Sequence, residues 1–221
     1  MPRTVLLVAL LIAPLALVAC GAEEPAPQIP IPRPATAVDL VGPWQAIPFV
    51  IDAGLRAKIE QTCRRDIEMP PGSLAAVIDV RGERVATIRM TGQNPGSCDA
   101  LELTDRGEVT GAGAGWRQDQ PEVLPELAPG AVGRVERQTV QGGGLDVRGW
   151  SVYGRIGPSV AAVEVAPERG PSLAATVENG WFAAWWPVQP GDPDMNEGFQ
   201  PKVIVRGYDA LGTVLSEARS P

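Results

Sequence analysis

Hydrophobic residues change their spacing twice along this chain of 221 residues. Residues 5–18 are almost entirely apolar, residues 25–34 contain five prolines, and apolar residues recur in short periodic segments from residue 38 onward. A run of about fourteen residues is too short to cross the hydrocarbon core of a bilayer, which requires about twenty. With Arg3 ahead of it, the run is typical of the hydrophobic region of a secretory signal peptide.

A helical period is present in residues 52–66. The apolar residues of this segment recur at every fourth position, at Leu55, Ile59 and Cys63. They form a narrow apolar stripe, and Asp52 is suited to cap the first turn of the helix. Glu60 and Arg64 are spaced for an ion pair on the exposed side. The sequence therefore predicts one helix whose cysteine points into the core.

The later segments alternate apolar with polar residues, and turn residues separate them, which predicts β-strands. The expected strands are 74–80, 84–91, 98–104, 108–116, 133–140, 145–156, 160–166, 172–178, 181–186, 202–208 and 213–218. In residues 84–91 we expect Ala86, Ile88 and Met90 to be buried and the opposite face to be half exposed. The overall expectation is a mostly β (α+β) fold, in which an N-terminal helix packs on an antiparallel sheet.

The C-terminal strands come at short intervals, which favours a β-sandwich after the first sheet. Residues 203–218, with the sequence VIVRGYDALGTVLSEA, resemble the last hairpin of bacterial immunoglobulin-like domains. This resemblance implies an immunoglobulin-like β-sandwich and no particular activity. We expect a helix and β-meander subdomain at 38–118, a connector at 119–132 and the sandwich at 133–221.

The stretch NGWFAAWWP at residues 179–187 holds four of the eleven aromatic residues. Alternation places Trp181, Ala183 and Trp185 on one face of a strand, and the remaining apolar residues on the other. Both faces are therefore apolar, which favours a strand buried on both sides. A stacking site for a sugar or peptide stays open, with Trp181 and Trp186 at the strand ends as the candidate contacts.

The apolar run ends in Leu17-Val18-Ala19-Cys20-Gly21, which resembles the lipobox of bacterial lipoproteins. The resemblance implies a signal peptide at 1–19, cleavage before Cys20 and acyl chains on that cysteine, with the protein held on the extracytoplasmic face of the cell membrane. Gly21 favours the outer membrane where the host has one. Residues 20–37 would then be a proline-rich tether, extended at about 3.1 Å per residue. The whole pattern is similar to uncharacterised secreted proteins of GC-rich bacteria, so it brings no activity with it.

The net charge and the absence of histidine exclude several classes of function. The net charge is −7, which argues against a nucleic-acid partner, because such proteins carry clustered basic patches. The chain has no histidine, so it has no Ser-His-Asp triad, Cys-His pair or histidine-based zinc site. No sequence motif indicates a cofactor. The expected partners are the membrane, through the lipid on Cys20, and an envelope protein or a glycan.

Two further chemical features are local. Cys63 and Cys98 are the cysteines that remain after Cys20, and a pair in an exported protein predicts a disulfide. Asp192, Asp194 and Asn196 have the spacing of the first calcium ligands in a calcium-binding loop. The glycine and the final glutamate of such a loop are replaced by Glu197 and Val203, so a solvated acidic loop is the favoured interpretation.

Together these features predict a membrane-anchored envelope lipoprotein with a non-enzymatic binding or accessory role. Two alternatives stay open. One is a carbohydrate- or peptidoglycan-binding lipoprotein that uses exposed tryptophans. The other is a hydrolase that depends on a carboxylate pair, which would require two acids about 5–10 Å apart in a cleft.

Overall fold

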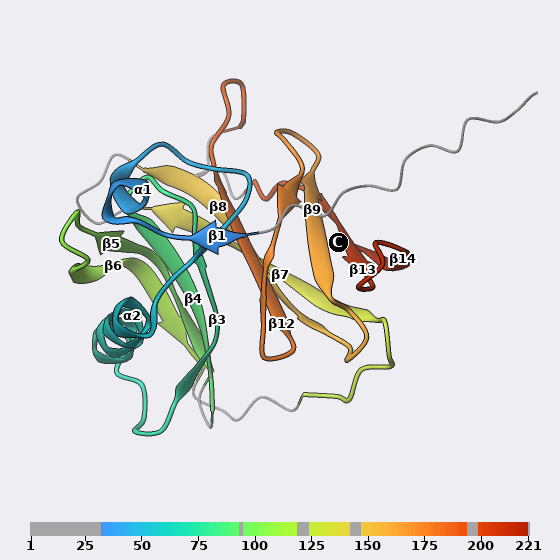
Figure 1. The fold of residues 1–221 in the computed structure, drawn as a ribbon, viewed down its shortest axis with the longest axis horizontal. Helices are drawn as coiled ribbons and strands as arrows, with labels where there is room; N and C mark the ends of the chain where they lie inside the picture. The colour runs from blue at the N-terminus through green and yellow to red at the C-terminus, as the bar shows by residue number, and fades with distance from the viewer. Residues whose placement is uncertain (1–31, 93–94, 119–123, 142–146, 194–198, 221) are drawn as a thin grey trace, which may run out of the picture.

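The computed structural model describes residues 32–92, 95–118, 124–141, 147–193 and 199–220 (Figure 1). The fold is mostly β, and three antiparallel sheets of four strands each make up most of it. The N-terminal sheet consists, in spatial order, of β3 (Leu74–Val80), β4 (Val85–Thr91), β5 (Gly96–Leu103) and β6 (Val109–Arg117). The central sheet consists of β11 (Thr176–Glu178), β12 (Trp181–Pro187), β8 (Arg148–Ile156) and β7 (Val132–Gln141). The C-terminal sheet consists of β10 (Leu173–Ala174), β9 (Ala162–Pro167), β13 (Val203–Tyr208) and β14 (Val214–Arg219).

The elements are stacked in layers, with the helix α2 (Ala53–Asp66) on one outer side and the C-terminal sheet on the other (Figure 1). One hydrophobic cluster joins α2 to the N-terminal sheet, and a second joins the central and C-terminal sheets. Two smaller clusters lie between the N-terminal and central sheets. The central sheet is therefore covered on both faces.

The helix α2 confirms the prediction made from its period. The Asp52 side chain accepts a hydrogen bond of 2.8 Å from the backbone N–H of Leu55, which caps the first turn. The apolar stripe is buried at Leu55, Ile59 and Cys63. Arg64 and Glu60 form the expected ion pair at 3.4 Å.

The strand β12 is buried along its whole aromatic segment. Trp181, Ala183 and Trp185 belong to the clusters that face the N-terminal sheet. Phe182, Ala184 and Trp186 belong to the cluster that faces the C-terminal sheet. Asn179 and Gly180 join β11 to β12 with φ of 49° and 74°, as a type I′ hairpin turn requires. The prediction of a strand buried on both sides is confirmed.

The prediction of a single strand at 172–178 is wrong, because this segment forms two strands that belong to different sheets. The strand β10 pairs with β9 in the C-terminal sheet, and β11 pairs with β12 in the central sheet. Ala175 lies between the two strands and is buried. The chain thus passes from one sheet to the other within a single residue, which a pattern of alternating polarity does not reveal.

The prediction for strand 84–91 needs a similar correction. Val85, Thr87 and Arg89 were expected to be half exposed, but their exposed fractions are 0%, 0% and 1%. The reason is that the central sheet covers this face of β4. A polar face of a strand is therefore buried here, and its polar groups require partners inside the protein.

The folded body begins earlier than residue 38, so the predicted tether 20–37 is too long at its C-terminal end. The short strand β1 (Arg33–Pro34) pairs in parallel with β2 (Phe49–Val50). The Arg33 guanidinium donates to both carboxylate oxygens of Asp39 at 2.7 and 2.6 Å. Thr36 and Asp39 form a capping box at the start of the short helix α1 (Ala37–Val41).

The turn between β3 and β4 lies against the chain that follows α1. Gly82 has φ of 96°, and a Cβ atom at this position would lie 2.6 Å from the carbonyl oxygen of Pro43. The backbone N–H of Arg84 donates to the Leu40 carbonyl at 2.9 Å. Only glycine fits this close approach, which fixes the N-terminal segment on the body. None of the helices in the described part of the chain is long and apolar enough to span a membrane.

Candidate binding site

The tryptophans proposed for ligand stacking are not exposed. Trp186 is 1% exposed and lies in the cluster between the central and C-terminal sheets. Trp181 is 6% exposed, and its ring lies 5.5 Å from the guanidinium of Arg89. The alternative of a stacking site at the strand ends, which the sequence left open, therefore finds no exposed ring at Trp186. Trp181 contributes to the wall of a cleft, which is described below.

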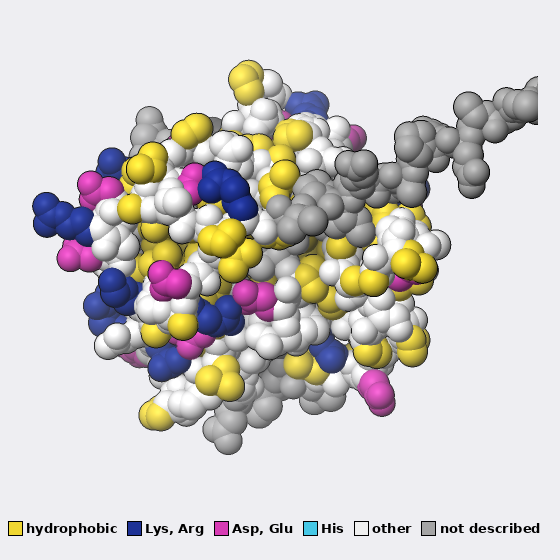
Figure 2. All heavy atoms as spheres, in the orientation of Figure 1, with side chains coloured by type: hydrophobic (Ala, Val, Ile, Leu, Met, Phe, Trp, Pro, Cys, Tyr) yellow, Lys and Arg dark blue, Asp and Glu magenta, His cyan; other side chains and the backbone are white. Residues whose placement is uncertain are grey.

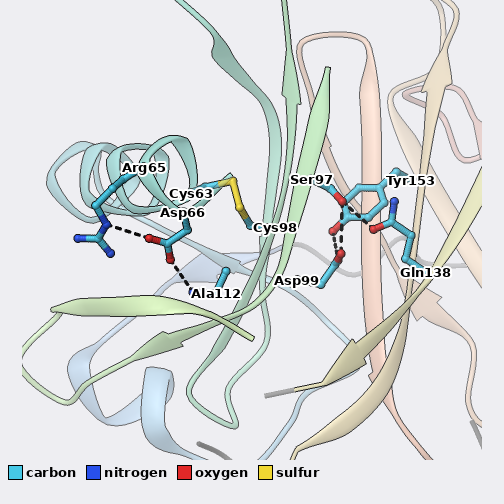
Figure 3. Close-up of a disulfide and its surroundings, with 9 residues drawn as sticks. All are labelled: Cys63, Arg65, Asp66, Ser97, Cys98, Asp99, Ala112, Gln138 and Tyr153. Carbon is cyan, nitrogen blue, oxygen red and sulfur yellow. Dashed lines mark hydrogen bonds and ion pairs between the residues drawn. A yellow bond between two sulfur atoms is a disulfide. The ribbon is translucent and has the colours of Figure 1, made fainter. Parts of the chain in front are cut away.

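The predicted disulfide is present. Cys63 of α2 and Cys98 of β5 are bonded, with their Cα atoms 5.7 Å apart (Figure 3). Next to the bond, the Asp66 carboxylate accepts hydrogen bonds from the Arg65 side chain and the backbone N–H of Ala112, both at 2.8 Å. The covalent bond fixes the end of the helix on β5, and the hydrogen bond of Asp66 fixes it on β6. Cys20, the proposed lipidation site, lies outside the described residues.

The weak calcium candidate is only partly described. The Asp192 carboxylate accepts a hydrogen bond of 2.8 Å from the backbone N–H of Gln189, so it caps its own turn. Asp194 and Asn196 lie outside the described residues. Among the described residues, no group of three or more histidine, cysteine, aspartate or glutamate residues could hold a metal ion.

A cluster of polar side chains lies between the N-terminal and central sheets, on the face of β5 opposite to the disulfide (Figure 3). Asp99 is 2% exposed, and its carboxylate accepts hydrogen bonds from the hydroxyls of Tyr153 at 2.7 Å, Ser151 at 3.0 Å and Ser97 at 3.3 Å. Ser97 shares its single hydroxyl hydrogen with the side-chain oxygen of Gln138 in β7, at 2.6 Å. The cluster therefore connects β5, β7 and β8.

The surroundings of this cluster change its proton affinity. Burial raises the pKa of Asp99 to about 6, and the three hydroxyl donors and the charge of Arg89 oppose the rise. Burial and the Asp99 charge raise the pKa of Tyr153 well above its ordinary value. A perturbed aspartate of this kind can mark a catalytic site, but a catalytic carboxylate must also reach a substrate. Asp99 and Tyr153 are buried and do not reach a substrate. Their hydrogen bonds join the N-terminal sheet to the central sheet.

A second buried polar group joins the same two sheets. Asp79 of β3 and Arg81, which follows this strand, are both fully buried and form an ion pair at 2.7 Å. The Asp79 carboxylate also accepts from the Thr176 hydroxyl at 2.6 Å, and the Arg81 guanidinium donates to the carbonyls of Ala46 and Ala174. This pair stands at the point where the chain passes from β10 to β11. It holds the crossing segment against the N-terminal sheet.

An open cleft of about 870 Å³ lies beside β7, where one edge of each of the three sheets contributes to the wall. Trp116 of β6 represents the N-terminal sheet, residues 133–138 of β7 the central sheet, and Ala218 and Arg219 of β14 the C-terminal sheet. The volume is in the range of ligand-binding clefts, about 300–1,000 Å³.

The charged residues of the cleft are mostly arginines: Arg134, Arg137, Arg155 and Arg219, with Glu136 as the acidic member. Glu136 already lies 3.6 Å from the buried Arg89, whose guanidinium lies 4.8 Å from the centre of the Trp116 ring. On the face drawn in Figure 2, by contrast, basic and acidic side chains are interspersed. The cleft is thus a local positive region in an acidic protein, and it is suited to bind an anionic partner.

The arrangement offers little to a hydrolase. Glu136 is the carboxylate that the described walls of the cleft present, and Asp99 is buried behind them. Ser151 is fully buried in β8 and donates to Asp99, so it is not an exposed nucleophile. Carboxylate-dependent hydrolysis requires two acids that flank the bond to be cleaved. The described walls of this cleft do not provide such a pair.

Sequence reasoning missed the arginine cleft and both buried polar groups. Arg134 and Arg137 lie in β7, Arg155 in β8 and Arg219 in β14, so no short motif joins them. One signal was present, because Arg89 and Asp79 interrupt strands that are otherwise apolar, and buried charges in such positions require partners.

Comparison of the chain with protein-family models, curated proteins and solved structures found no match in any of the three sets.

Proposed function

We propose that the protein is a lipid-anchored lipoprotein of the cell envelope with a non-enzymatic binding role. The observation that carries the binding role is the cleft beside β7, which is lined by arginines and has the volume of a ligand site. The perturbed carboxylate, Asp99, lies buried behind its wall. The groups that line the cleft are therefore suited to hold a ligand and not to cleave one.

The anchor is proposed from the sequence LVACG at residues 17–21. Two or more acyl chains on Cys20 would hold the body durably on a membrane surface. The Cys63–Cys98 disulfide supports an extracytoplasmic location, because such bonds persist in oxidising compartments. The described body begins at residue 32, close to the proposed anchor, and its first strand β1 is already paired.

We also propose that the central and C-terminal sheets form an immunoglobulin-like β-sandwich. Three features support this assignment: a shared hydrophobic cluster between the two sheets, the passage of the chain from β10 to β11, and the hairpin of β13 and β14. In such folds the edge strands and loops commonly carry the binding surface. The position of the cleft at the edges β7 and β14 agrees with that use.

A glycan is the alternative ligand, and Trp116 is the residue that favours it. Its side chain is partly exposed and lines the cleft, where an indole can stack on a sugar ring. Arg89 lies over the ring, however, which leaves less of the aromatic surface for stacking. The glycan alternative therefore rests on one partly covered tryptophan.

The anchor can be tested by fractionation of cells that produce the native protein or Cys20→Ala. We expect the native protein in the membrane fraction, and we expect Cys20→Ala in the soluble fraction with an unchanged melting temperature. As a matched control, Cys63→Ala with Cys98→Ala should remain in the membrane fraction, because those cysteines do not carry the lipid. Retention of Cys20→Ala on the membrane would contradict the proposed anchor.

A further inference from the structure

We propose that the cleft beside β7 binds an extended acidic segment of a partner protein, which adds a strand to the outer edge of β7. The carboxylates of this segment would lie on the arginines of the cleft. This inference rests on the binding role proposed above and specifies the partner for the same site. Strand addition to a sheet edge is a common way for proteins to recognise peptides.

Along β12, the backbone N–H and C=O groups of successive residues point alternately toward β11 and toward β8. Glu178 and Trp181 flank the two-residue turn and pair across it, so the N–H and C=O groups of Trp181 point toward β11. The N–H of Trp185 donates to Asp79 and its carbonyl accepts from the Trp44 indole at 3.0 Å, on the same side. The alternate residues Phe182 and Ala184 therefore direct their backbone groups toward β8.

The same alternation along β8 shows which backbone groups of β7 point away from the sheet. Since Gly154 and Val152 of β8 pair with β12 through their backbone groups, Tyr153 and Ser151 have theirs directed toward β7. Their partners on β7 are Glu136 and Gln138. The remaining residues of this part of β7 direct their N–H and C=O groups away from β8, and they are Val135, Arg137 and Thr139.

The outer edge of β7 is therefore a row of backbone donors and acceptors. Among the described residues, no backbone hydrogen bond reaches this edge between residues 133 and 139. The neighbouring edge strands β6 and β14 contact β7 but belong to other sheets. An unpaired strand edge is a template for an added strand, and the cleft supplies the space beside it.

The charges of the cleft define the partner. Among the described residues, no carboxylate lies within ion-pair distance of Arg134, Arg137 or Arg155. The Arg137 guanidinium donates to the carbonyl of Pro201 at 3.2 Å, and that of Arg155 donates to the carbonyl of Pro125. These contacts orient both side chains without neutralising their charge. Glutamate or aspartate side chains of a bound strand would supply the missing carboxylates.

An acidic peptide fits these observations better than an acidic glycan does. A glycan could satisfy the arginines, but it has no regular series of N–H and C=O groups to pair with β7. The aromatic surface that a glycan would use is limited, because Trp181 is buried and Arg89 lies over Trp116. The free backbone edge and the arginines together therefore favour a peptide.

The test uses the purified full-length lipoprotein in detergent and a fluorescent peptide of about ten residues with alternating glutamate and threonine. Fluorescence anisotropy measures binding of this peptide, of its glutamine–threonine analogue, and of a copy with N-methylated backbone on alternate residues. We expect binding of the acidic peptide, and affinities lower by about tenfold or more for both analogues. Added salt should weaken binding.

Matched variants locate the site. Arg134→Ala with Arg137→Ala should lower the affinity by about tenfold or more, whereas Arg106→Ala, in the exposed turn between β5 and β6, should leave it unchanged. Melting curves establish that each variant is folded. If the acidic peptide does not bind, or if the double variant binds it equally well, the proposal is wrong.

Two other outcomes separate this proposal from neighbouring ones. Equal affinity for the N-methylated peptide would overturn strand addition. Binding of oligogalacturonate, with loss in the arginine variant and without peptide binding, would overturn the peptide in favour of an acidic glycan. Membrane attachment of Arg134→Ala with Arg137→Ala is measured in parallel. If attachment persists while no probe binds, the anchor stands and the binding site alone fails.

Discussion

The carboxylate of Asp79 in β3 accepts a hydrogen bond of 3.1 Å from the backbone N–H of Trp185 in β12, although the two residues belong to different sheets. The partner strand β11 ends its pairing with β12 at Ala183, because the chain crosses to the C-terminal sheet before that point. Trp185 is therefore left without a backbone partner on this side. Asp79 takes that place and ties the N-terminal sheet to the central one.

Replacement of Asp79 tests the importance of this contact. In Asp79→Asn the buried Arg81 loses its counter-charge, and breaking a buried ion pair from one side commonly costs about 3–5 kcal/mol. We expect a loss of this size in the free energy of unfolding, measured by denaturant titration. The matched control is Asp105→Asn in an exposed turn, for which we expect a change within about 0.5 kcal/mol. Equal effects of the two changes would contradict the role of Asp79.

The Asp99 cluster predicts a pH dependence of stability. Burial raises the pKa of Asp99 to about 6 in the folded state, so the folded protein binds this proton more tightly than the unfolded chain does. The contribution of Asp99 to the free energy of unfolding is therefore fully present below about pH 4, and it is lost as the pH rises through about 6. The positive charge of Arg89 opposes the rise in the pKa of Asp99, and Tyr153, whose own pKa is raised by burial, keeps its proton in this range.

Asp99→Asn isolates this effect, because asparagine keeps the shape and carries no charge. We expect Asp99→Asn to match the native protein at about pH 4 and to exceed its free energy of unfolding by up to about 3 kcal/mol at pH 7. Denaturant titrations across this range measure the difference. A difference that stays constant with pH would mean that Asp99 does not titrate as its burial requires.

The elements of this fold could be predicted well where local patterns decide them. The helix at 53–66 follows from the spacing of its apolar residues, and β12 follows from the two apolar faces of WFAAWW. The Asn179–Gly180 turn follows from the conformations that these residues favour. The errors occur at 172–178 and 84–91, where the position of another sheet decides the outcome.

The candidate site could not be predicted, because its residues come together only in the folded chain. Cys63 and Cys98 were paired correctly, since the compartment and the cysteine count leave few alternatives. Asp99, Tyr153 and Ser151 belong to two strands of different sheets, and their contacts depend on register. The sequence left exposure of Trp186 open, because a strand end is exposed only if no other element covers it, and here the C-terminal sheet does.

The disulfide should contribute strongly to stability. It closes a loop with a sequence separation of 35 residues, which corresponds to about 3–4 kcal/mol in the chain-entropy model. We expect a reducing agent to lower the melting temperature of the native protein. The double variant Cys63→Ala with Cys98→Ala should melt at the lower temperature with or without the reducing agent. If the melting temperature of the native protein does not change on reduction, the disulfide does not make this contribution.

Tryptophan fluorescence tests the burial of the central sheet. Trp150, Trp181, Trp185 and Trp186 are buried, whereas Trp44 and Trp116 are partly exposed. In the variant Trp44→Phe with Trp116→Phe, we expect blue-shifted emission that acrylamide quenches weakly. The native protein should be quenched more strongly, because its two partly exposed indoles contribute. Strong quenching of the double variant would show that the indoles of the central sheet reach solvent.

The proposed function depends most on the lipid at Cys20, because that anchor would place the cleft at a membrane surface. The direct measurement is mass spectrometry of the N-terminal peptide from protein extracted from the membranes of its native host. We expect a peptide that begins at Cys20 and carries the mass of a diacylglyceryl group, with or without an added acyl chain on its amino group. A peptide that retains residues before Cys20, or begins at Cys20 without added mass, would contradict the account.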